Sequence, residues 1–213
     1  MGVAIRLVQA GEEVFIGSRK ADKAERAAEE IKLFLEDENI DNVFGFTNPE
    51  AAKRADIIIL TVPIVAQQPT VASVKDYVKD KVLIDATVPL ESTIGGKPTK
   101  YFSLWGGSAA ERTEDILKGT GVKVVSGLNN ICSHSLMDFK EEVDCDCLIS
   151  GDDDEAKKIA AELIEKIPGV VCVDCGLLEQ SRTVERLTAL LISLNIKHKS
   201  RKGGIRITGL KKN

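Results

Sequence analysis

Short apolar runs alternate with segments of helical periodicity along most of this chain, and this alternation constrains the fold more than any other feature. The apolar runs lie at residues 14–16, 57–62 and 82–86. Between the first two, residues 21–35 place apolar side chains at three- and four-residue spacings, which predicts an amphipathic helix. Strands that alternate with helices in this way predict an α/β fold with a parallel, doubly wound sheet.

The first residues do not fit the usual start of such a sheet. Residues 1–10 predict the second half of a helix that closes at Gly11. A dinucleotide-binding sheet begins instead with a strand and a G-x-G-x-x-G turn, whose amides hold a pyrophosphate. We therefore expect a Rossmann-type sheet whose first strand and glycine loop are missing. That strand would lie between residues 14–16 and 57–62, and without it we expect an unstable chain that binds a dinucleotide weakly.

Small and basic side chains occupy the tip of the strand at residues 14–16. Gly17 ends the strand, Ser18 and Arg19 follow in a turn, and Lys23 lies one helical turn further on. At this place a dinucleotide fold carries an acid for the 2′-hydroxyl of NAD or a basic residue for the 2′-phosphate of NADP. The stretch is compatible with NADP recognition, because Arg and Lys both bind phosphate. A solvated turn with two ordinary surface cations is the alternative.

Composition and charge argue against several classes of function. The net charge of −4 argues against nucleic acid as the main partner. No apolar run approaches the ~18 residues of a membrane span and no signal peptide precedes the first strand, so we expect a cytoplasmic protein without membrane contact. The odd count of five cysteines indicates reduced thiols. We expect buried, inert thiols rather than a zinc site, because the spacing within the two close pairs does not clearly support metal binding.

Residues 90–107 interrupt the alternation with a long loop that contains glycines and aromatic residues. Loops of this length are often functional, and the aromatics could either cover a flat ring system or fill a small satellite core. From residue 141 the pattern changes, and we expect a first domain over residues 1–140 and a small α/β domain over 141–213. Residues 183–196 predict a helix with an apolar stripe that suits either a subunit or domain interface or ordinary core packing, and we expect a homodimer. The stripe consists of Val184, Leu187, Leu190, Leu191 and Leu194.

Seven segments of the chain, in order, resemble the coenzyme F420-dependent NADP oxidoreductases of methanogens and related archaea. The segments are GSRKADKAERAAEE, DIIILTVP, the run to DATVPL, KVVSGLNN, ISGDDDEAKKIA, VDCGLLEQSRTVERLTALLI and GGIRITGL. Members of that family move a hydride between reduced F420, a deazaflavin, and NADP. The resemblance implies an oxidoreductase with NADP and coenzyme F420 as cofactors. It also implies that the small C-terminal domain closes the F420 site, so that the two rings lie face to face.

The resemblance also implies which residues contact the cofactors. Ser18, Arg19 and Lys23 correspond to contacts with the 2′-phosphate of NADP. The wall beside the nicotinamide-side ribose corresponds to Val62, Pro63, Ala66 and Gln67, and Val88 corresponds to the residue beside the nicotinamide. Ser133 corresponds to a position in the loop beside the reacting rings. The tail that closes over the site corresponds to Gly203 and Gly204. Packing at strand ends is the alternative for Val62, Val88 and Ser133. No acid–base residue and no metal site is implied.

The family opens with a strand and a GGTG-type loop, so the resemblance implies a chain that is truncated at its N-terminus. A fragment or a misassigned start is one explanation, and a short form that survives as a binding module is the other. An NADP-dependent reductase of a small carbonyl or imine is a second enzyme hypothesis. A non-catalytic NADP-binding or scaffold protein is the third hypothesis. Oxidation of reduced F420 by NADP separates the first hypothesis from the other two.

Overall fold

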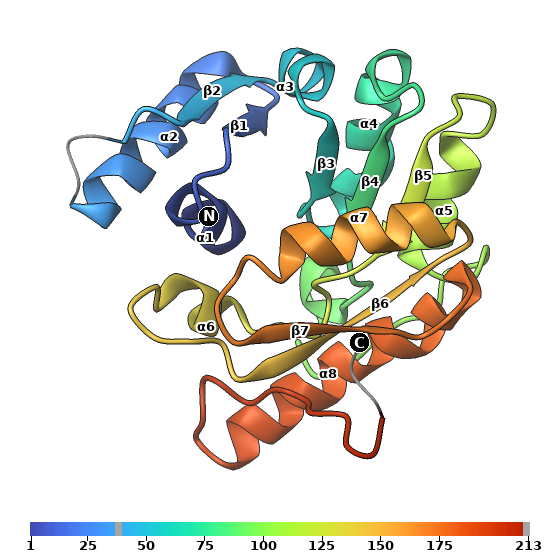
Figure 1. Cartoon of the computed structure of the whole chain (residues 1–213). Coiled ribbons are helices and arrows are strands. Elements are labelled where there is room, and N and C mark those ends of the chain that lie inside the picture. Colours follow the sequence, from blue (N-terminus) through green and yellow to red (C-terminus); the bar gives the residue numbers. More distant parts are fainter. Residues whose placement is uncertain (37–39, 211–213) are drawn as a thin grey trace.

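The structure, a computed structural model, describes residues 1–36 and 40–210, and Figure 1 shows the arrangement of the elements. The strands are β1 (Val14–Ser18), β2 (Val43–Thr47), β3 (Ile57–Leu60), β4 (Val82–Asp85), β5 (Lys123–Ser126), β6 (Cys145–Gly151) and β7 (Val170–Asp174). The α-helices are α1 (Gly2–Gln9), α2 (Ala21–Leu35), α3 (Asn48–Arg54), α4 (Ile64–Val74), α5 (Ala109–Ile116), α6 (Ser133–Met137), α7 (Asp154–Ile164) and α8 (Ser181–Lys197). Short 3₁₀ turns are η1 (Lys75–Tyr77), η2 (Glu91–Ile94) and η3 (Leu178–Gln180). The predicted α/β class is confirmed.

The strands form two separate sheets. One contains five strands in the order β3-β4-β5-β6-β7, and the other contains only β1 and β2. Neighbouring strands run parallel except β5 and β6, which meet antiparallel. The prediction of a parallel sheet is therefore confirmed for β3 to β5 and for β1 with β2. Within the described ranges no pairing joins β1 to β3.

The segment beyond residue 140 continues the larger sheet. Its strands β6 and β7 follow directly on β5, with register contacts from Val125 to Gly151 and from Ser126 to Ser150. In Figure 1, α7 and α8 lie on opposite sides of these two strands. The C-terminal segment thus shares one sheet with the strands that precede it, and the predicted division at residues 140 and 141 stays a prediction.

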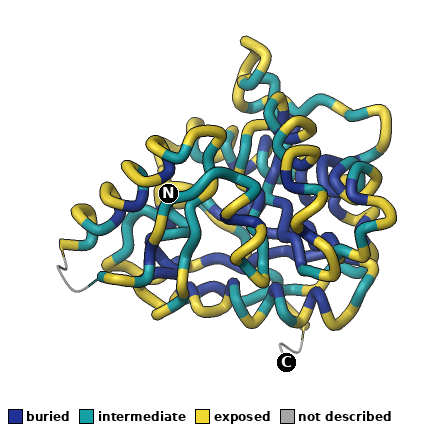
Figure 2. The backbone as a smooth tube through the Cα atoms, turned by 90° about the horizontal axis from the view of Figure 1, so that it is seen from above, coloured by how far each residue is buried: buried dark blue, intermediate teal, exposed yellow. Residues whose placement is uncertain are grey.

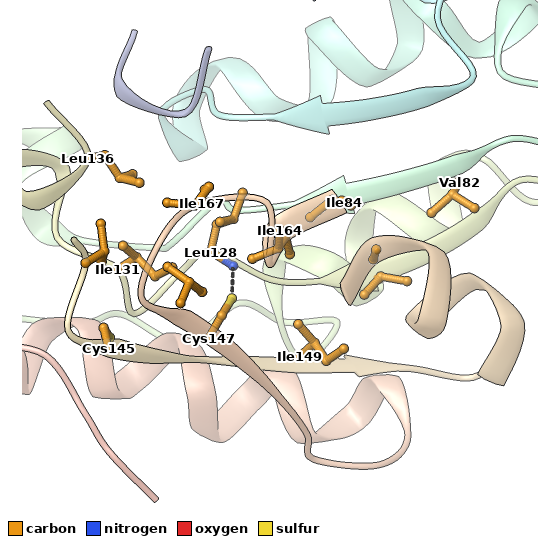
Figure 3. Close-up of a cluster of buried hydrophobic side chains, with 14 of the residues drawn as sticks. Val82, Ile84, Leu128, Ile131, Leu136, Cys145, Cys147, Ile149, Ile164 and Ile167 are labelled. Atoms are coloured by element: carbon orange, nitrogen blue, oxygen red, sulfur yellow. Dashed lines mark hydrogen bonds between the residues drawn. The ribbon is translucent and has the colours of Figure 1, made fainter. Parts of the chain in front are cut away.

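The largest apolar core lies between α7 and the sheet. It joins Ile84 of β4, Val125 of β5, Ile149 of β6 and Ile164 of α7, all nearly inaccessible to solvent. Figure 3 shows this cluster, in which the backbone N–H of Leu128 donates to a buried cysteine thiol at 3.2 Å. Figure 2 shows buried residues concentrated in the strands and exposed residues on the outer turns of the helices. The core positions the carboxyl ends of β3, β4 and β5 at one edge.

Local sequence signals account for several helix ends. α1 is followed by Gly11 at φ +84°, in the left-handed region that glycine adopts without strain, as the sequence predicts. α3 begins with a capping box, in which Thr47 and Glu50 satisfy each other's backbone N–H groups, and Pro49 occupies its first turn. The predicted helix over residues 21–35 is confirmed residue for residue.

Some local features differ from what the sequence pattern alone favours. The apolar run of β1 is typical of a buried strand, but β1 is half-buried because only β2 pairs with it. Helix α4 ends at Val74, and the 3₁₀ turn η1 follows it. Residues 202–208 are irregular, although the carbonyl of Ile205 accepts a hydrogen bond from a β6 amide at 2.7 Å. None of the helices in the described residues is long and apolar enough to cross a membrane.

Candidate functional site

A cleft of about 780 Å³ separates the small sheet from β3. Its walls include the first residues of α1, the strand β1 up to Gly17, the run of residues 57–62, and two residues of α6, Ser133 and Leu136. Val62 and Ser133 are therefore the predicted site residues that line this cleft. The remaining predicted site residues lie outside its lining.

The tip of β1 presents two cations and a hydroxyl. Ser18 is the last residue of β1 and is half-buried, whereas Arg19 and Lys23 are exposed. Lys23 lies in the first turn of α2, whose N-terminus carries the positive end of the helix dipole. Neither Arg19 nor Lys23 has a carboxylate partner within 4.0 Å among the residues that the structure describes. The group is therefore suited to bind an anion.

The turn after β3 offers an apolar surface. Val62 is half-buried, Pro63 is exposed, and the N–H of Ala66 donates to the carbonyl of Pro63 at 2.8 Å as α4 begins. This turn lies at the carboxyl end of β3, and ligands of open α/β sheets bind beyond the carboxyl ends of the strands. The turn can therefore contact a ligand by its shape and its backbone.

Gln67, the fourth residue predicted in that wall, has its side chain in the protein interior. Its Nε2 donates to Asp85 at 2.8 Å, to the carbonyl of Ala109 at 2.8 Å and to the Thr113 hydroxyl at 3.0 Å. Its Oε1 accepts from Nε of Arg112 at 2.7 Å. The side chain is fully buried and held by these contacts, so a ligand beside this turn would contact the backbone of Gln67 rather than its side chain.

Two buried carboxyl groups, which the sequence patterns did not reveal, lie behind this turn. Asp85 ends β4 and accepts from the Thr113 hydroxyl at 2.6 Å, and burial raises its pKa. Glu185 of α8 accepts from the N–H groups of Ala109 and Ala110 at 2.9 and 3.2 Å, and burial raises its pKa to about 8. The Glu185 carboxyl thus links α8 to the first turn of α5. An acid at the end of an apolar strand was the only sequence signal of this network.

Val88 follows the end of β4 and is half-buried, at the entrance to the long loop over residues 90–107. In this loop the Tyr101 hydroxyl lies 3.5 Å from the Glu185 carboxylate, and burial raises the pKa of Tyr101 to about 12. Trp105 is fully exposed. Tyr101 therefore packs against α8, as the satellite-core alternative predicts, whereas Trp105 is free to cover a flat ring.

Ser133 is exposed at the first position of α6. A buried arginine, Arg6 of α1, donates to five carbonyl groups in and after this helix, at distances of 2.6 to 3.3 Å. Burial lowers the pKa of the Arg6 guanidinium. Sequence reasoning missed this contact, because nothing in the α1 pattern distinguishes Arg6 from a surface residue. Arg6 sets the position of the helix that carries Ser133.

The C-terminal tail packs against β6 close to the loop that carries Ser133. The N–H of Gly203 donates to Oδ1 of Asn195 at 2.9 Å, and a Cβ at Gly204 would lie 2.9 Å from the Cys145 sulfur. The Cys132 thiol donates to the Arg201 carbonyl at 2.8 Å, which joins the tail to the residue before Ser133. The two glycines therefore permit a close approach of the tail to the sheet.

Comparison with known proteins supports one family. The sequence profile described as "NADP oxidoreductase coenzyme F420-dependent" matches residues 1–89. The F420-dependent NADP reductase of Methanothermobacter thermautotrophicus is 50% identical over 99% of this chain and 90% of its own length. Those of Methanothermobacter marburgensis and Methanocaldococcus jannaschii are 51% and 43% identical, over 99% and 98% of this chain and 93% of each relative.

Solved structures agree on the fold. A crystal structure from Arthrobacter sp. FB24 superposes with a TM-score of 0.82 at 21% identity, and the match covers 98% of this chain and 94% of that one. An imine reductase from Myxococcus stipitatus superposes with a TM-score of 0.64 at 14% identity, over 93% and 59% of the two chains. Identities this low support the fold alone. The curated relatives at 43–51% identity, matched over nearly the whole chain, confirm the resemblance, and the protein belongs to the F420-dependent NADP reductase family.

Proposed function

We propose that this protein transfers a hydride between reduced coenzyme F420 and NADP. The observation that carries the proposal is the identity of 43–51%, over nearly the whole chain, to proteins named F420-dependent NADP reductase. The deazaflavin supplies the hydride chemistry when it is bound, and the protein's part is to orient two rings and exclude water. Apolar and backbone contacts suffice for that task, and the site offers both.

Ser18, Arg19 and Lys23 bind the 2′-phosphate of NADP in this proposal. Their exposure and the absence of carboxylate partners among the described residues support the assignment, because the cations are available to a phosphate. The guanidinium of Arg19 offers a planar fork to phosphate oxygens, Lys23 a point charge and Ser18 a hydroxyl. The positive end of the α2 dipole adds to the attraction.

The nicotinamide end lies across the carboxyl ends of β3 and β4. Val62, Pro63 and Ala66, with the backbone of Gln67, form the ribose wall, and Val88 lies beside the nicotinamide. The support is topological: β3 and β4 are parallel neighbours, so the residues that follow them lie at one edge of the sheet. The half-buried apolar side chains of Val62, Ala66 and Val88 suit a flat ring that is held by shape.

The F420 side is formed by Ser133 and by the tail with Gly203 and Gly204. The hydrogen bond from Cys132 to Arg201 supports this pairing, because it brings the tail next to the loop that carries Ser133. In this proposal the segment over residues 141–213 closes the F420 site. Ser133 is exposed and has room for a ligand.

The direct test mixes the protein with reduced F420 and NADP and follows the absorbance of the oxidised deazaflavin. We expect the oxidised coenzyme to appear only when both reactants are present. Turnover of a small imine with NADPH but no turnover of F420 would support the second enzyme hypothesis instead. Nucleotide binding without turnover of either substrate would support the non-catalytic hypothesis.

The choice of nucleotide is tested by Arg19→Ala. A charge-assisted contact with phosphate contributes about 1.5–3 kcal/mol, so we expect the affinity for NADP to fall roughly ten- to a hundredfold and that for NAD to stay nearly constant. Arg26→Ala is the matched control, because Arg26 lies on the adjacent helix α2 and pairs with Asp22 at 2.6 Å. Calorimetric titration with both nucleotides measures the effect. Equal losses for NADP and NAD would contradict the assignment.

We further propose that the protein is a cytoplasmic homodimer whose partners are small-molecule coenzymes rather than nucleic acid. Leu190 and Leu194 of α8 are 53% and 43% exposed, so this part of the predicted stripe is available for an interface. Val184 and Leu191 of the same helix are buried within the chain. The predicted leucine stripe thus serves internal packing and, in this proposal, subunit contact. The net charge of −4 disfavours a polyanionic partner.

A further inference from the structure

The turn between β5 and α6 contains a residue in a backbone conformation that most residues avoid. Leu128 has φ +65°, in the left-handed region, although it carries a bulky side chain and is not a glycine. Such a residue persists only where its surroundings fix it, and residues of this kind cluster at functional sites. Leu128 lines the cleft described above, a few residues before Ser133. The turn over residues 127–130 is therefore a candidate for a functional role.

Contacts from β6 and α8 hold this turn. The N–H of Leu128 donates to Sγ of Cys147 in β6 at 3.2 Å (Figure 3). Asn130 exchanges two hydrogen bonds with the backbone of β6, at 2.7 and 3.0 Å. The Thr188 hydroxyl of α8 donates to the carbonyl of Asn129 at 2.8 Å. These contacts fix the turn to the C-terminal segment of the chain.

The Asn129 side chain joins the same turn to the end of β4. Asn129 is 5% exposed, and its Nδ2 donates to two carbonyl groups. These are the carbonyls of Asp85 and Thr87, at 3.5 and 3.4 Å. Its Oδ1 accepts from the buried Ser126 hydroxyl at 3.1 Å, which fixes the orientation of the amide. Because Thr87 directly precedes Val88, this amide is bonded to the backbone that positions Val88.

We propose that Asn129 is a positioning residue that sets the separation between the nicotinamide and the deazaflavin ring. The inference rests on the proposed hydride transfer. The Asn129 side chain holds the backbone that leads to Val88, and its main chain continues into the loop that carries Ser133. It acts through these two segments and contacts neither coenzyme. Reacting atoms must lie about 3–3.5 Å apart, and a displacement of about 1 Å can lower a rate about a hundredfold.

The test replaces Asn129 with leucine, which has the same branched shape and no donor. Asn42→Leu is the matched control, because the Asn42 amide likewise donates to two carbonyl groups, at 3.1 and 2.8 Å, and lies outside the lining of the cleft. Single-turnover mixing of reduced F420 with NADP, both saturating, measures the rate of hydride transfer. Calorimetry measures the affinity for NADP. Amide hydrogen exchange is followed by NMR at Thr87 and Ile131, whose N–H groups are bonded on either side of the Asn129 contact.

We expect Asn129→Leu to lower the rate of hydride transfer roughly ten- to a hundredfold. The affinity for NADP should stay nearly constant, because the proposed 2′-phosphate contacts lie at β1 and α2, and this separation of rate from affinity identifies a loss confined to the transition state. The amides of Thr87 and Ile131 should exchange at least about tenfold faster. Asn42→Leu should change neither the rate nor this exchange.

Two results would overturn the inference alone. One is turnover that Asn129→Leu does not slow, and the other is a loss of rate that an equal loss of NADP affinity accompanies, since this would indicate a purely structural role. No turnover by the unaltered protein would instead overturn the proposed function, and this inference with it. Where Asn129→Leu gives no cooperative melt, Thr188→Val takes its place, because it removes only the hydrogen bond from α8 to the Asn129 carbonyl. A lower rate at constant NADP affinity is expected for this variant too, and an unchanged rate would overturn the inference.

Discussion

Replacement of Arg6 should destabilise this fold sharply. It is 2% exposed, and its guanidinium donates to the carbonyl groups of residues 135, 136, 138, 139 and 141. These carbonyls belong to the end of α6 and the loop after it. The last four C=O groups of a helix have no N–H partner within the helix, so they need donors from elsewhere. Arg6→Met keeps most of the apolar stem and removes every one of these donors.

The expected cost follows from two opposing terms. Hydrogen bonds to a charged group contribute about 1.5–3 kcal/mol each, but they are not additive, and the carbonyls of the outer loop can turn to water. The variant also recovers the desolvation cost of a buried cation, which amounts to several kcal/mol. We expect a net loss of roughly 3–5 kcal/mol, which is large against a total stability of ~5–15 kcal/mol. Arg6→Lys, with three donors instead of five, should lose roughly half as much.

Urea unfolding followed by far-ultraviolet circular dichroism measures this loss through the shift of the midpoint at constant slope. Arg26→Met is the matched control, because its side chain is 73% exposed and its ion pair with Asp22 should contribute at most about 1 kcal/mol. A second readout is hydrogen exchange in α6, which should accelerate in Arg6→Met. A loss no greater than that of the control, or unchanged exchange in α6, would refute the argument that Arg6 holds this helix.

Three further predictions address packing, titration and assembly. Gly45→Ala should destabilise the fold by about 1–3 kcal/mol or more, because the added Cβ would lie 2.2 Å from the backbone nitrogen of Glu25. Gly106→Ala is the control: it has open space around it and should leave the thermal melt unchanged. The raised pKa of Glu185, about 8, means that its contribution to stability is complete below its ordinary pKa and is lost as the pH rises to about 8. In Glu185→Gln the free energy of unfolding should therefore decrease less as the pH rises over that range. A dependence on pH equal to that of the unaltered protein would contradict this. If α8 forms the dimer interface, Leu190→Arg should reduce the mass measured by light scattering to that of one chain, 23.1 kDa, and leave the thermal melt unchanged. A variant that is still a dimer would exclude that surface.

The sequence by itself determined the elements whose signals are local. The apolar spacing over residues 21–35 predicts α2 at its true bounds, and Gly11 marks the end of α1 because only a residue without Cβ takes φ +84° freely. The apolar runs place β3 and β4 to within two residues. Family membership also followed from the sequence, because motifs such as GDDDEA and SRTVE lie in order along the chain. The cofactor contacts at Ser18, Arg19 and Val88 stay predictions.

Tertiary structure alone decided which residues meet across the chain. The antiparallel junction of β5 with β6, and the separation of β1 from β3, depend on pairing partners that no local pattern specifies. Gln67 was predicted beside a ribose, yet its side chain belongs to the Asp85 network. Arg6 bonds to a carbonyl 130 residues away and Glu185 to an amide 76 residues away. Side-chain periodicity reports only which face of an element is apolar, so the partners of a buried polar group emerge only when distant segments pack together.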